Sequence, residues 1–361
     1  MEKFAFIMHP LEARADVSRK YPFVRHLPEG LVEWGLKFKG PMSLSHITGV
    51  KSLTGTEAEG WFIGCPLSAR QMMTLPTDYV LGKIIESARV AQDVGAGIVG
   101  LGAYTSIVGD GGITIAKNVD IAFTTGNSYT IATAIQGALK AAPMMGIDPS
   151  QTKAAVVGAA GSIGRTCARI LAKHVPEINI VDLNIESVRK VADEIASESN
   201  ASVKTFTDVH DGIKDADIVA TATSAVTAII HPRDIKSGAV VCDVARPRDV
   251  SSKVAKERDD VLVIDGGVIA VPGEVDFGFN FGFPPRMAYA CMSETMALAL
   301  EGRYESFTLG KTVSIEQVDE ISALAAKHGF KLAGFRSFER AVTQEQIERI
   351  RDNARQKLLV R

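Results

Sequence analysis

The feature that most constrains the fold of this chain is a glycine-rich turn between a predicted strand and a predicted helix. The turn lies in the stretch KAAVVGAAGSIGRTCARILAKHV, which begins at Lys153. Gly158 is expected to allow the tight turn, Gly161 the approach of a pyrophosphate to the backbone, and Gly164 the close packing of helix against strand. Free N–H groups and the dipole at the start of such a helix favour an anion. The stretch therefore predicts a dinucleotide-binding domain.

Short apolar segments rich in β-branched residues continue after this turn and alternate with predicted helices. This pattern is typical of a parallel sheet covered on both faces, and right-handed crossovers then produce a doubly wound Rossmann arrangement. The first part of the chain has further strand-like segments and a predicted helix over residues 78–94. We therefore predict an α/β fold: a Rossmann dinucleotide-binding domain plus an α/β substrate domain completed by C-terminal helices. The further Rossmann strands are expected in INIVDLN, ASVKTF, ADIVATATS, GAVVCDVARP and VLVIDGG.

The predicted elements divide the chain into four ranges. A helix from Ser128 to about Met144 is expected to join the N-terminal domain to the Rossmann domain. A helix is also predicted over residues 284–302, where two prolines precede small apolar residues. The last helix begins with a capping box formed by Thr343 and Gln346. The predicted ranges are 1–126 for the N-terminal α/β substrate domain, 127–283 for the Rossmann NAD(P)-binding domain, 284–335 for a C-terminal helical segment carrying Cys291, and 336–361 for a terminal amphipathic helix.

One acidic residue refines the expected choice of nucleotide. Asp182 ends the strand after the glycine-rich turn, close to the offset of about 20 residues at which a carboxylate accepts hydrogen bonds from the adenosine hydroxyls. A carboxylate there repels a 2′-phosphate, and neither Leu183 nor Asn184 supplies a positive charge. The expected cofactor is therefore NADH or NADPH, with NADH favoured by Asp182. The residues expected to contact it are Gly158, Ala159, Ala160, Gly161, Ser162, Ile163, Gly164, Asp182, Thr223, Ser224, Val244 and Gly266.

A charged stretch follows the fifth predicted strand of the Rossmann domain. It contains Asp243, Arg246, Arg248 and Asp249. Ligands lie outside the carboxyl ends of such strands, so these side chains could face the nucleotide. The simpler interpretation is a solvated loop whose charges pair with one another.

Composition and charge exclude several classes of protein. The composition is that of an ordinary globular chain, and the net charge of −2 includes no block of like charge that would favour nucleic acid. The four cysteines form no CxxC pair and the seven histidines form no HExxH group, so no metal site is predicted. The start MEKFAFIMHP is typical of a first strand rather than of a signal peptide, and no apolar stretch is long enough to span a bilayer. We therefore expect a cytoplasmic protein with no nucleic-acid partner and no transmembrane segment.

The four cysteines lie in different predicted surroundings. Cys167 and Cys242 fall within a helix and a strand and are most simply small buried residues. Cys65 precedes a proline in a turn, where it can be exposed. Cys291 lies near the start of the predicted C-terminal helix, and helix N-termini and neighbouring cations, here Arg286, lower the pKa of a thiol. The residues alone leave two interpretations of Cys291 open: a packed small side chain or a nucleophile.

Two polar loops are unusual for a plain core. They are LGAYTSIVGDGG, residues 101–112, and FTTGNSYT, residues 123–130. The first is rich in glycine, which lets a ligand approach the backbone. In the second, Thr125 and Asn127 can cap the following helix, or can hold a carbonyl oxygen as negative charge develops on it. The candidate catalytic residues are therefore Cys291, Asn127 and Thr125.

These motifs together resemble those of the aldehyde-forming long-chain acyl-acyl-carrier-protein reductases. The resemblance runs in order from about Phe4 to Phe335 and is most specific in TTGNSYT and ACMSETMALALEG. It implies NAD(P)H-dependent reduction of an acyl thioester to an aldehyde, with the acyl group carried covalently on Cys291. It also implies that acyl-CoA or acyl carrier protein is the partner. The stretch DVARPRDV is similar to glutamyl-tRNA reductases, another group that forms a thioester.

Two other functions stay open at this point. An NAD-dependent dehydrogenase of the amino-acid or shikimate type would transfer a hydride without covalent catalysis, and would need a Lys–Asp pair, for which Lys117 and Asp120 are candidates. A non-enzymatic NAD-sensing module would bind NADH and oxidise none. The apolar stripe of the terminal helix, which includes Ile347, Ile350 and Ala354, is expected to pack on the body of the chain or on a second subunit. A homo-oligomer is therefore a further hypothesis.

Overall fold

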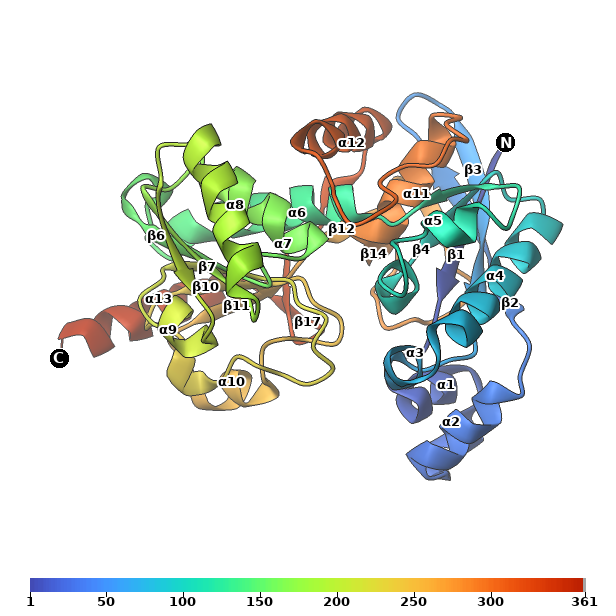
Figure 1. Cartoon of the computed structure of the whole chain (residues 1–361), viewed down its shortest axis with the longest axis horizontal. Coiled ribbons are helices and arrows are strands. Elements are labelled where there is room, and N and C mark those ends of the chain that lie inside the picture. The colour runs from blue at the N-terminus through green and yellow to red at the C-terminus, as the bar shows by residue number, and fades with distance from the viewer. Residues whose placement is uncertain (360–361) are drawn as a thin grey trace. The chain divides into compact units, whose positions relative to one another are not determined.

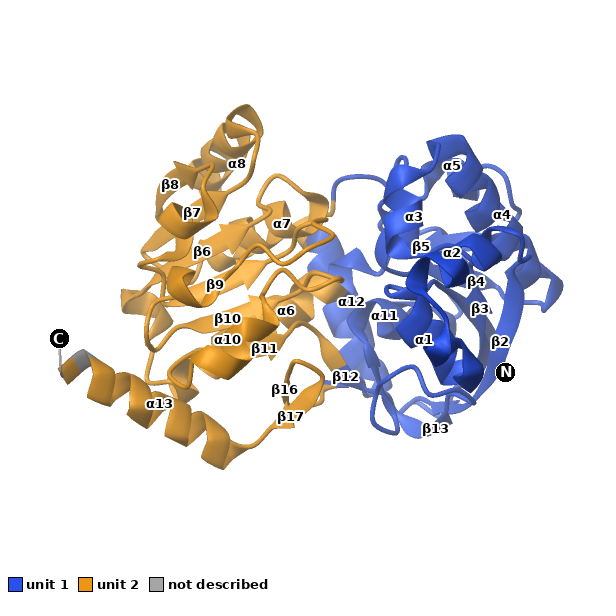
Figure 2. Ribbon diagram, turned by 90° about the horizontal axis from the view of Figure 1, so that it is seen from below, with its two compact units in different colours: residues 1–129, 269–312, 316–331 blue, residues 130–268, 313–315, 332–361 orange. Residues whose placement is uncertain are grey.

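The structure, a computed structural model, describes residues 1–359 and contains two compact units, coloured blue and orange in Figure 2. The grouping differs from the predicted ranges. Residues 127–129 and 269–283 belong to the first unit and not to the Rossmann domain, and the described residues after 331 belong to the second unit. The first unit is Met1–Tyr129, Ile269–Thr312 and Glu316–Lys331, and the second is Thr130–Val268, Val313–Ile315 and Leu332–Arg361.

The second unit contains the predicted Rossmann sheet. Its six strands run parallel in the order β11-β10-β9-β6-β7-β8, which is the doubly wound order. Helices α7 and α8 lie on one side of these strands, and α9 and α10 lie on the other (Figure 1). The predicted α/β fold class is therefore confirmed. The bounds are β6 Lys153–Val157, α7 Ser162–Leu171, β7 Glu177–Val181, α8 Ile185–Glu198, β8 Ser202–Phe206, α9 Val209–Ile213, β9 Ile218–Thr221, β10 Val240–Asp243, α10 Ser252–Glu257 and β11 Leu262–Asp265.

The first unit is built on a mixed sheet with the strand order β13-β2-β3-β1-β4-β5. Strands β1, β3, β4 and β5 run parallel, and β2 pairs antiparallel with both β3 and β13. The sequence pattern predicted the four parallel strands but missed β2 and β13, because β2 leaves most of its side chains at least partly exposed and β13 is short. The bounds are β1 Glu2–Met8, β2 Met42–Lys51, β3 Glu57–Gly64, β4 Ile98–Leu101, β5 Ala122–Thr124 and β13 Gly273–Asp276.

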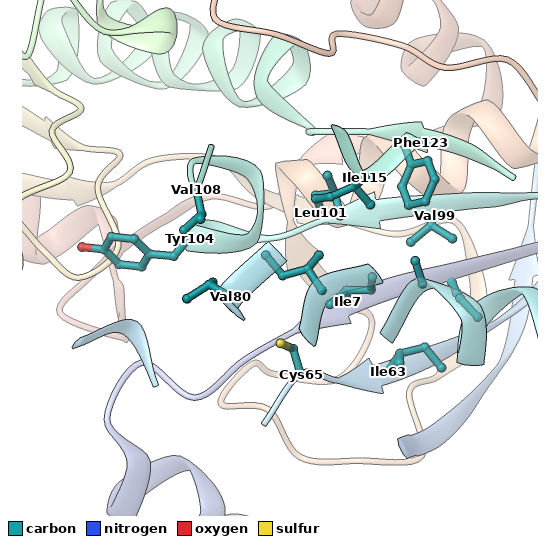
Figure 3. Packing of buried hydrophobic residues seen from close by; sticks show 14 of the residues in the cluster. Ile7, Ile63, Cys65, Val80, Val99, Leu101, Tyr104, Val108, Ile115 and Phe123 are labelled. Atoms are coloured by element: carbon teal, nitrogen blue, oxygen red, sulfur yellow. The ribbon is translucent and has the colours of Figure 1, made fainter. Parts of the chain in front are cut away.

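Apolar side chains fill the space between this sheet and helix α4. Figure 3 shows part of the cluster, in which Ile7 and Val99 of the strands lie with Val80 of α4. Helix α11 contacts the opposite face, where an ideal Cβ built at Gly100 would lie 2.1 Å from the Thr295 hydroxyl. The helices of the two units not yet given are α1 Ala13–Lys20, α2 Glu29–Lys37, α3 Ala69–Thr74, α4 Thr77–Asp93, α5 Ile113–Ala116, α6 Asn127–Met144, α11 Ala290–Leu300, α12 Ile315–His328 and α13 Gln344–Leu359.

The segment predicted as one helix over residues 284–302 contains a strand and a shorter helix. Strand β14, Met287–Tyr289, precedes α11. A turn precedes this strand, in which the Met287 N–H donates to the Pro284 carbonyl oxygen over 3.2 Å, and the Arg286 carbonyl oxygen accepts the Val271 N–H over 2.9 Å. The two prolines therefore do not open the helix, and Cys291 lies in its first turn rather than its second.

The terminal helix α13 is confirmed together with its capping box, in which the Gln346 N–H donates to Thr343 Oγ1 over 3.3 Å. Ile347 and Ala354 of the apolar stripe are buried, and Asn353 Nδ2 donates to the Asp259 carbonyl oxygen over 3.1 Å. The stripe therefore packs on the body of the same unit. The predicted range 336–361 also includes most of the hairpin of β16 Phe335–Ser337 and β17 Arg340–Val342, and its last two residues, 360 and 361, lie outside the described residues.

None of the described helices combines the length and the apolar character needed to cross a bilayer. Over residues 1–359, no three histidine, cysteine, aspartate or glutamate side chains gather as the ligands of a metal ion would.

Candidate active site

The parallel strands of the first unit bring several polar residues to one edge of its sheet. The segments that follow β1, β3, β4 and β5 leave the sheet at this shared carboxyl edge. His9 follows β1, Cys65 follows β3, the turn Ala103–Ser106 follows β4 and Thr125 follows β5. Ligands of α/β sheets bind outside the carboxyl ends of parallel strands. Both polar loops of the sequence therefore lie where a substrate is expected.

Cys291 is the second residue of α11, whose N-cap residue, Tyr289, provides no side-chain cap. The partial positive charge of a helix N-terminus stabilises a thiolate. Cys291 is half-buried, whereas the other three cysteines are buried. Burial raises the pKa of Cys65 and of Cys167 to about 12, and raises that of Cys242 as well. Among the described cysteines, Cys291 is therefore the one suited to act as a nucleophile, and the expectation of an exposed Cys65 is wrong.

Arg286, the cation suggested by the sequence, lies on the exposed surface of the first unit. Its guanidinium forms an ion pair with the Glu274 carboxylate. Because this charge is already paired, we assign the stabilisation of a Cys291 thiolate to the N-terminus of α11.

The TTGN turn lies against Cys291. Gly126 has a φ of +71°, and an ideal Cβ built on it would lie 2.2 Å from the Cys291 Cβ atom. No real side chain fits at that distance, so the absence of a side chain at Gly126 is what allows the turn and the start of α11 to meet. The structure thus brings Cys291 against the turn that also contains Asn127, although the two are distant in the sequence.

We expect Gly126→Ala to destabilise the protein by about 2 kcal/mol or more, because the added methyl group is strained by the positive φ and overlaps Cys291. The rate of alkylation of Cys291 by iodoacetamide should change in the same variant, since the thiol must move. Thermal unfolding and timed alkylation measure both effects. Gly55→Ala is a matched control, because Gly55 also has a positive φ but has no neighbour within 4 Å. Equal changes in stability and in alkylation rate for the two variants would contradict the contact between Gly126 and Cys291.

A buried carboxylate lies one helical turn after Cys291. Glu294 is fully buried and accepts four hydrogen bonds. Two come from the first turn of α6, from the Ser128 hydroxyl at 2.6 Å and the Tyr129 N–H at 2.8 Å. The others come from the hydroxyl of Thr124 and, at 3.1 Å, from that of Thr308. Glu294 therefore ties the start of α6 and the end of β5 to the helix that carries Cys291.

Burial raises the pKa of Glu294 above its ordinary value, although its four donors act in the opposite direction. A buried carboxylate without these donors would be strongly unfavourable, so the donors and the acid stabilise one another. The sequence analysis missed this residue. A signal was present, because Glu294 is the one charged residue of a helix otherwise made of small and apolar residues.

The two polar candidates of the TTGN turn differ in their surroundings. The Thr125 hydroxyl is buried and donates to the Thr308 carbonyl oxygen over 2.8 Å, so it serves the structure of the turn. The Asn127 side chain has no hydrogen-bond partner among the described residues, and 9% of its surface is exposed. Of the two, Asn127 is the better candidate for a donor to a substrate.

His9 connects two loops at the same edge. Its Nε2 atom accepts the Tyr104 N–H over 3.1 Å, which leaves Nδ1 to donate to the Pro10 carbonyl oxygen, also at 3.1 Å. Both bonds suit a neutral ring. Burial of the ring lowers the pKa of His9 to about 4. His9 therefore holds the turn after β4 next to the end of β1.

We expect His9 to make the protein less stable in acid. Because the pKa of His9 is lower in the folded than in the unfolded chain, the unfolded chain takes up the proton first. The contribution is present above pH 6.5 and is lost as the pH falls from 6.5 toward 4. For a half-buried ring we expect a loss of about 2 kcal/mol. Urea unfolding at pH 7 and pH 4 should show a smaller decrease for His9→Gln than for the wild type, and an equal decrease would contradict this role.

The glycine-rich turn of the second unit has the geometry expected of a phosphate cradle. Gly158 has a φ of +80°, and an ideal Cβ on Gly164 would lie 2.0 Å from the Gly158 carbonyl oxygen. Gly161 is the N-cap of α7 and adds no side-chain cap, so the helix N-terminus stays open to an anion. Asp182 Oδ2 accepts the Ala160 N–H over 3.0 Å, which brings the carboxylate beside the turn.

The other predicted nucleotide contacts lie at the carboxyl ends of neighbouring strands. Thr223 and Ser224 follow β9, Val244 follows β10 and Gly266 follows β11. The Val244 N–H donates to the Thr221 carbonyl oxygen over 2.9 Å, so these loops begin side by side. The predicted set thus surrounds one edge of the sheet, and its geometry fits a dinucleotide.

The interpretation of residues 243–249 as a solvated loop is wrong. Asp243 and Asp249 are fully buried. Asp249 accepts the Thr223 N–H over 3.0 Å, and Asp243 accepts the Val250 N–H over 3.0 Å. Burial raises the pKa of Asp243 to about 6. These carboxylates therefore brace the loops at the nucleotide edge from within.

The Lys–Asp pair required by a dehydrogenase mechanism is not formed by the proposed residues. Lys117 and Asp120 are both exposed, and no ion pair joins them in the described part of the chain. Asp120 lines a cavity with Gly97 and Ala122, which lie at the amino ends of β4 and β5. Asp120 therefore lies near the amino ends of these strands, and not at the carboxyl edge that leads to Gly126.

A comparison with known families matches the second unit. Residues 140–266 match the family described as shikimate / quinate 5-dehydrogenase. The match covers the glycine-rich turn and all six Rossmann strands. Together with the strand order, it shows that the second unit is an NAD(P)-binding domain.

Comparisons with curated proteins extend over more of the chain. The chain is 29% identical over 359 residues to the aminotransferase PigE of Serratia sp., in an alignment that covers 96% of this chain and 41% of PigE. The chain thus spans less than half of that relative. It is 28% identical to the long-chain acyl-acyl-carrier-protein reductase of Synechococcus elongatus, with 91% and 98% of the two chains covered. A glutamyl-tRNA reductase of Streptococcus sanguinis is 30% identical over 170 residues, which are 47% of this chain and 38% of that protein. The chain is therefore a distant homologue of PigE and of a long-chain acyl-acyl-carrier-protein reductase, with a shorter similarity to glutamyl-tRNA reductases.

Proposed function

We propose that this protein reduces an acyl thioester to an aldehyde with NADH or NADPH, through an acyl group carried on Cys291. The single observation that carries the proposal is the position of Cys291. It is half-buried at the uncapped N-terminus of α11, against the glycine of the TTGN turn. The distant homology to an acyl-acyl-carrier-protein reductase supports the same chemistry.

In the first step, the Cys291 thiolate attacks the carbonyl carbon of the thioester. A carbon–sulfur bond forms, and the carbonyl electron pair moves onto oxygen. The Asn127 amide is the donor we assign to that oxyanion. The oxyanion collapses, the bond to the carrier sulfur breaks, and the carrier thiolate leaves and takes up a proton from water. Covalent catalysis of this kind divides one difficult step into two easier ones.

The second step releases the product from Cys291. A reduced nicotinamide, when bound, supplies the hydride that reduces the acyl carbon. The residues we assign to hold it are the glycine-rich turn Gly158–Gly164, Asp182, Thr223, Val244 and Gly266. The resulting oxyanion is again held by Asn127. Its collapse breaks the bond to Cys291 and returns the thiolate at the helix N-terminus, which is a good leaving group because that N-terminus stabilises its charge.

The proposal is tested by trapping the acyl group without reductant. The protein is incubated with palmitoyl-CoA or with palmitoyl-acyl carrier protein, with no nicotinamide present, and its intact mass is measured. We expect a mass increase of one acyl group, and peptide mapping should locate it on Cys291. Adding NADH should then remove the adduct and release an aldehyde. An adduct on another cysteine, or none with either thioester, would sink the proposal.

We expect Asp182→Ala to raise the KM for NADH by about tenfold and to lower the KM for NADPH, because the carboxylate binds the adenosine hydroxyls and repels a 2′-phosphate. Initial rates with both nucleotides measure the change. Asp215→Ala removes an exposed carboxylate elsewhere on the second unit and should alter neither KM. A wild-type protein that already prefers NADPH would refute the role of Asp182.

A further inference from the structure

Helix α2 carries apolar residues on two faces. On the inner face, Val32 and Leu36 are spaced four residues apart and pack with Val24 and Ala13 in a small core of their own. This core explains how α1 and α2 are held to one another. The other large apolar residues of α2 lie outside this core.

The outer face of this segment is exposed and aromatic. It consists of Leu31, Trp34 and Phe38, with exposed fractions of 49%, 59% and 75%, and Phe23, which precedes α2 in the chain, is also 67% exposed. Leu31, Trp34 and Phe38 follow the i, i+3, i+7 spacing of one helix face. The Trp34 and Phe38 rings contact each other with their centroids 5.0 Å apart. Scattered apolar residues are normal on a protein surface, but a contiguous aromatic stripe marks an interaction site.

Three positive charges without a carboxylate partner flank the outer face along the chain. Arg25, Lys37 and Lys39 are exposed, and none of the three has a carboxylate partner among the described residues. The two acidic residues of α2 are both paired: Glu33 is buried and forms an ion pair with Arg70, and Glu29 forms one with Arg14. The surface therefore presents cations beside its rings, although the chain as a whole has a net charge of −2.

Aromatic rings flanked by lysine and arginine are the composition of helices that lie in the interface of a bilayer. Rings enter the boundary between headgroups and acyl chains, and the cations contact anionic headgroups. Figure 1 shows α1 and α2 projecting from the lower end of the first unit, beyond the strands of its sheet. We propose that the outer face of α2 binds the surface of a bilayer that contains anionic lipids. This proposal does not depend on the function proposed for Cys291.

Trp34 provides a direct probe of this contact. The chain has two tryptophans, and the other, Trp61, is half-buried and stacks on His46 with ring centroids 5.0 Å apart. In a Trp61→Phe variant of the full chain, the emission of Trp34 is measured with vesicles of phosphatidylcholine alone and with vesicles that also contain phosphatidylglycerol. We expect a blue shift with the anionic vesicles, and quenching when their lipids carry bromine near the headgroups.

Vesicle flotation then tests which residues bind. Phe38→Ser should weaken binding to anionic vesicles by about tenfold or more, since a large apolar side chain no longer enters the bilayer. Lys37→Glu and Lys39→Glu should each weaken it by at least about fivefold, an effect that added salt reduces. Leu53→Ser removes an equally exposed apolar side chain of the same unit, 74% exposed, and should have no effect.

Three results would overturn the proposal: no binding to either kind of vesicle, binding that Phe38→Ser leaves unchanged, or equal loss of binding with Leu53→Ser. The proposal would also fail if vesicles did not bind while the same substitutions abolished binding to an acidic acyl carrier protein. Conversion of a dimer to a monomer in light scattering, again without vesicle binding, would have the same meaning. The outer face would then be a protein interface.

Discussion

Cys291→Ala is expected to lower kcat/KM for acyl-thioester reduction by at least about a thousandfold, because the covalent route needs the sulfur atom. The folded state should be retained, since Cys291 is half-buried and its side chain is small. NADH oxidation in the presence of acyl-CoA, followed at saturating nucleotide, measures the loss. Binding of NADH, measured by fluorescence titration, should be unchanged because the nucleotide residues lie in the second unit.

Cys242→Ala is the matched control for this result. Cys242 is also a single cysteine, but it is buried within β10 and burial raises its thiol pKa. Cys242→Ala should lower the free energy of unfolding by about 1 kcal/mol, and the acyl adduct on Cys291 should still form. If Cys291→Ala kept most of the activity, hydride transfer without a covalent intermediate would become the better description.

Glu294→Ala is expected to destabilise the protein by about 4 kcal/mol or more, because it leaves four buried donors without their acceptor. The expected consequence is a large decrease in the thermal midpoint. Loss of the network should also release the start of α6, so amide hydrogen exchange of Ser128 and Tyr129 should speed up. Glu294→Gln keeps one oxygen as acceptor and should recover part of the stability. The neutral amide loses hydrogen bonds, but it costs less to bury than a carboxylate.

Ser293→Ala is a strict control for this second prediction. Ser293 is the preceding residue of α11, is equally buried, and its hydroxyl oxygen has no hydrogen-bond partner among the described residues. Removing that hydroxyl should change the stability little or increase it slightly. A large loss in Ser293→Ala, equal to that of Glu294→Ala, would mean that α11 tolerates no change and that the network has no special role.

Much of the second unit could be predicted from the chain alone. A parallel sheet buried on both faces needs apolar, β-branched strands, and each of them appears as a short local run of residues. The glycine-rich turn is equally local, because a positive φ at Gly158 and the close approach at Gly164 both depend on residues within one turn. The burial of Asp249 was not predicted for the opposite reason, since its donors Thr221 and Thr223 lie at the end of another strand, β9, and just after it.

The first unit was predicted less completely. Strand β2 was missed because its outer face is polar and its register shifts twice along β3, which removes the regular alternation. The helix predicted over residues 284–302 is too long, because the chain turns at Arg286, which has a φ of +61°, and then forms strand β14. Neither a bulge nor a non-glycine residue in the left-handed region has a reliable signature in sequence.

By itself, the sequence determined that the chain contains a nucleotide-binding Rossmann sheet, a TTGN turn after a strand, and a cysteine close to a helix start. These are local patterns, whose physical causes act over a few neighbouring residues. Only the tertiary structure decided that Gly126 lies against Cys291, that Glu294 accepts hydrogen bonds from β5 and α6, and that Cys65 is buried. Contacts between residues more than 160 positions apart depend on how strands and helices pack, and a periodic pattern predicts which face of an element is buried but not which partner covers it.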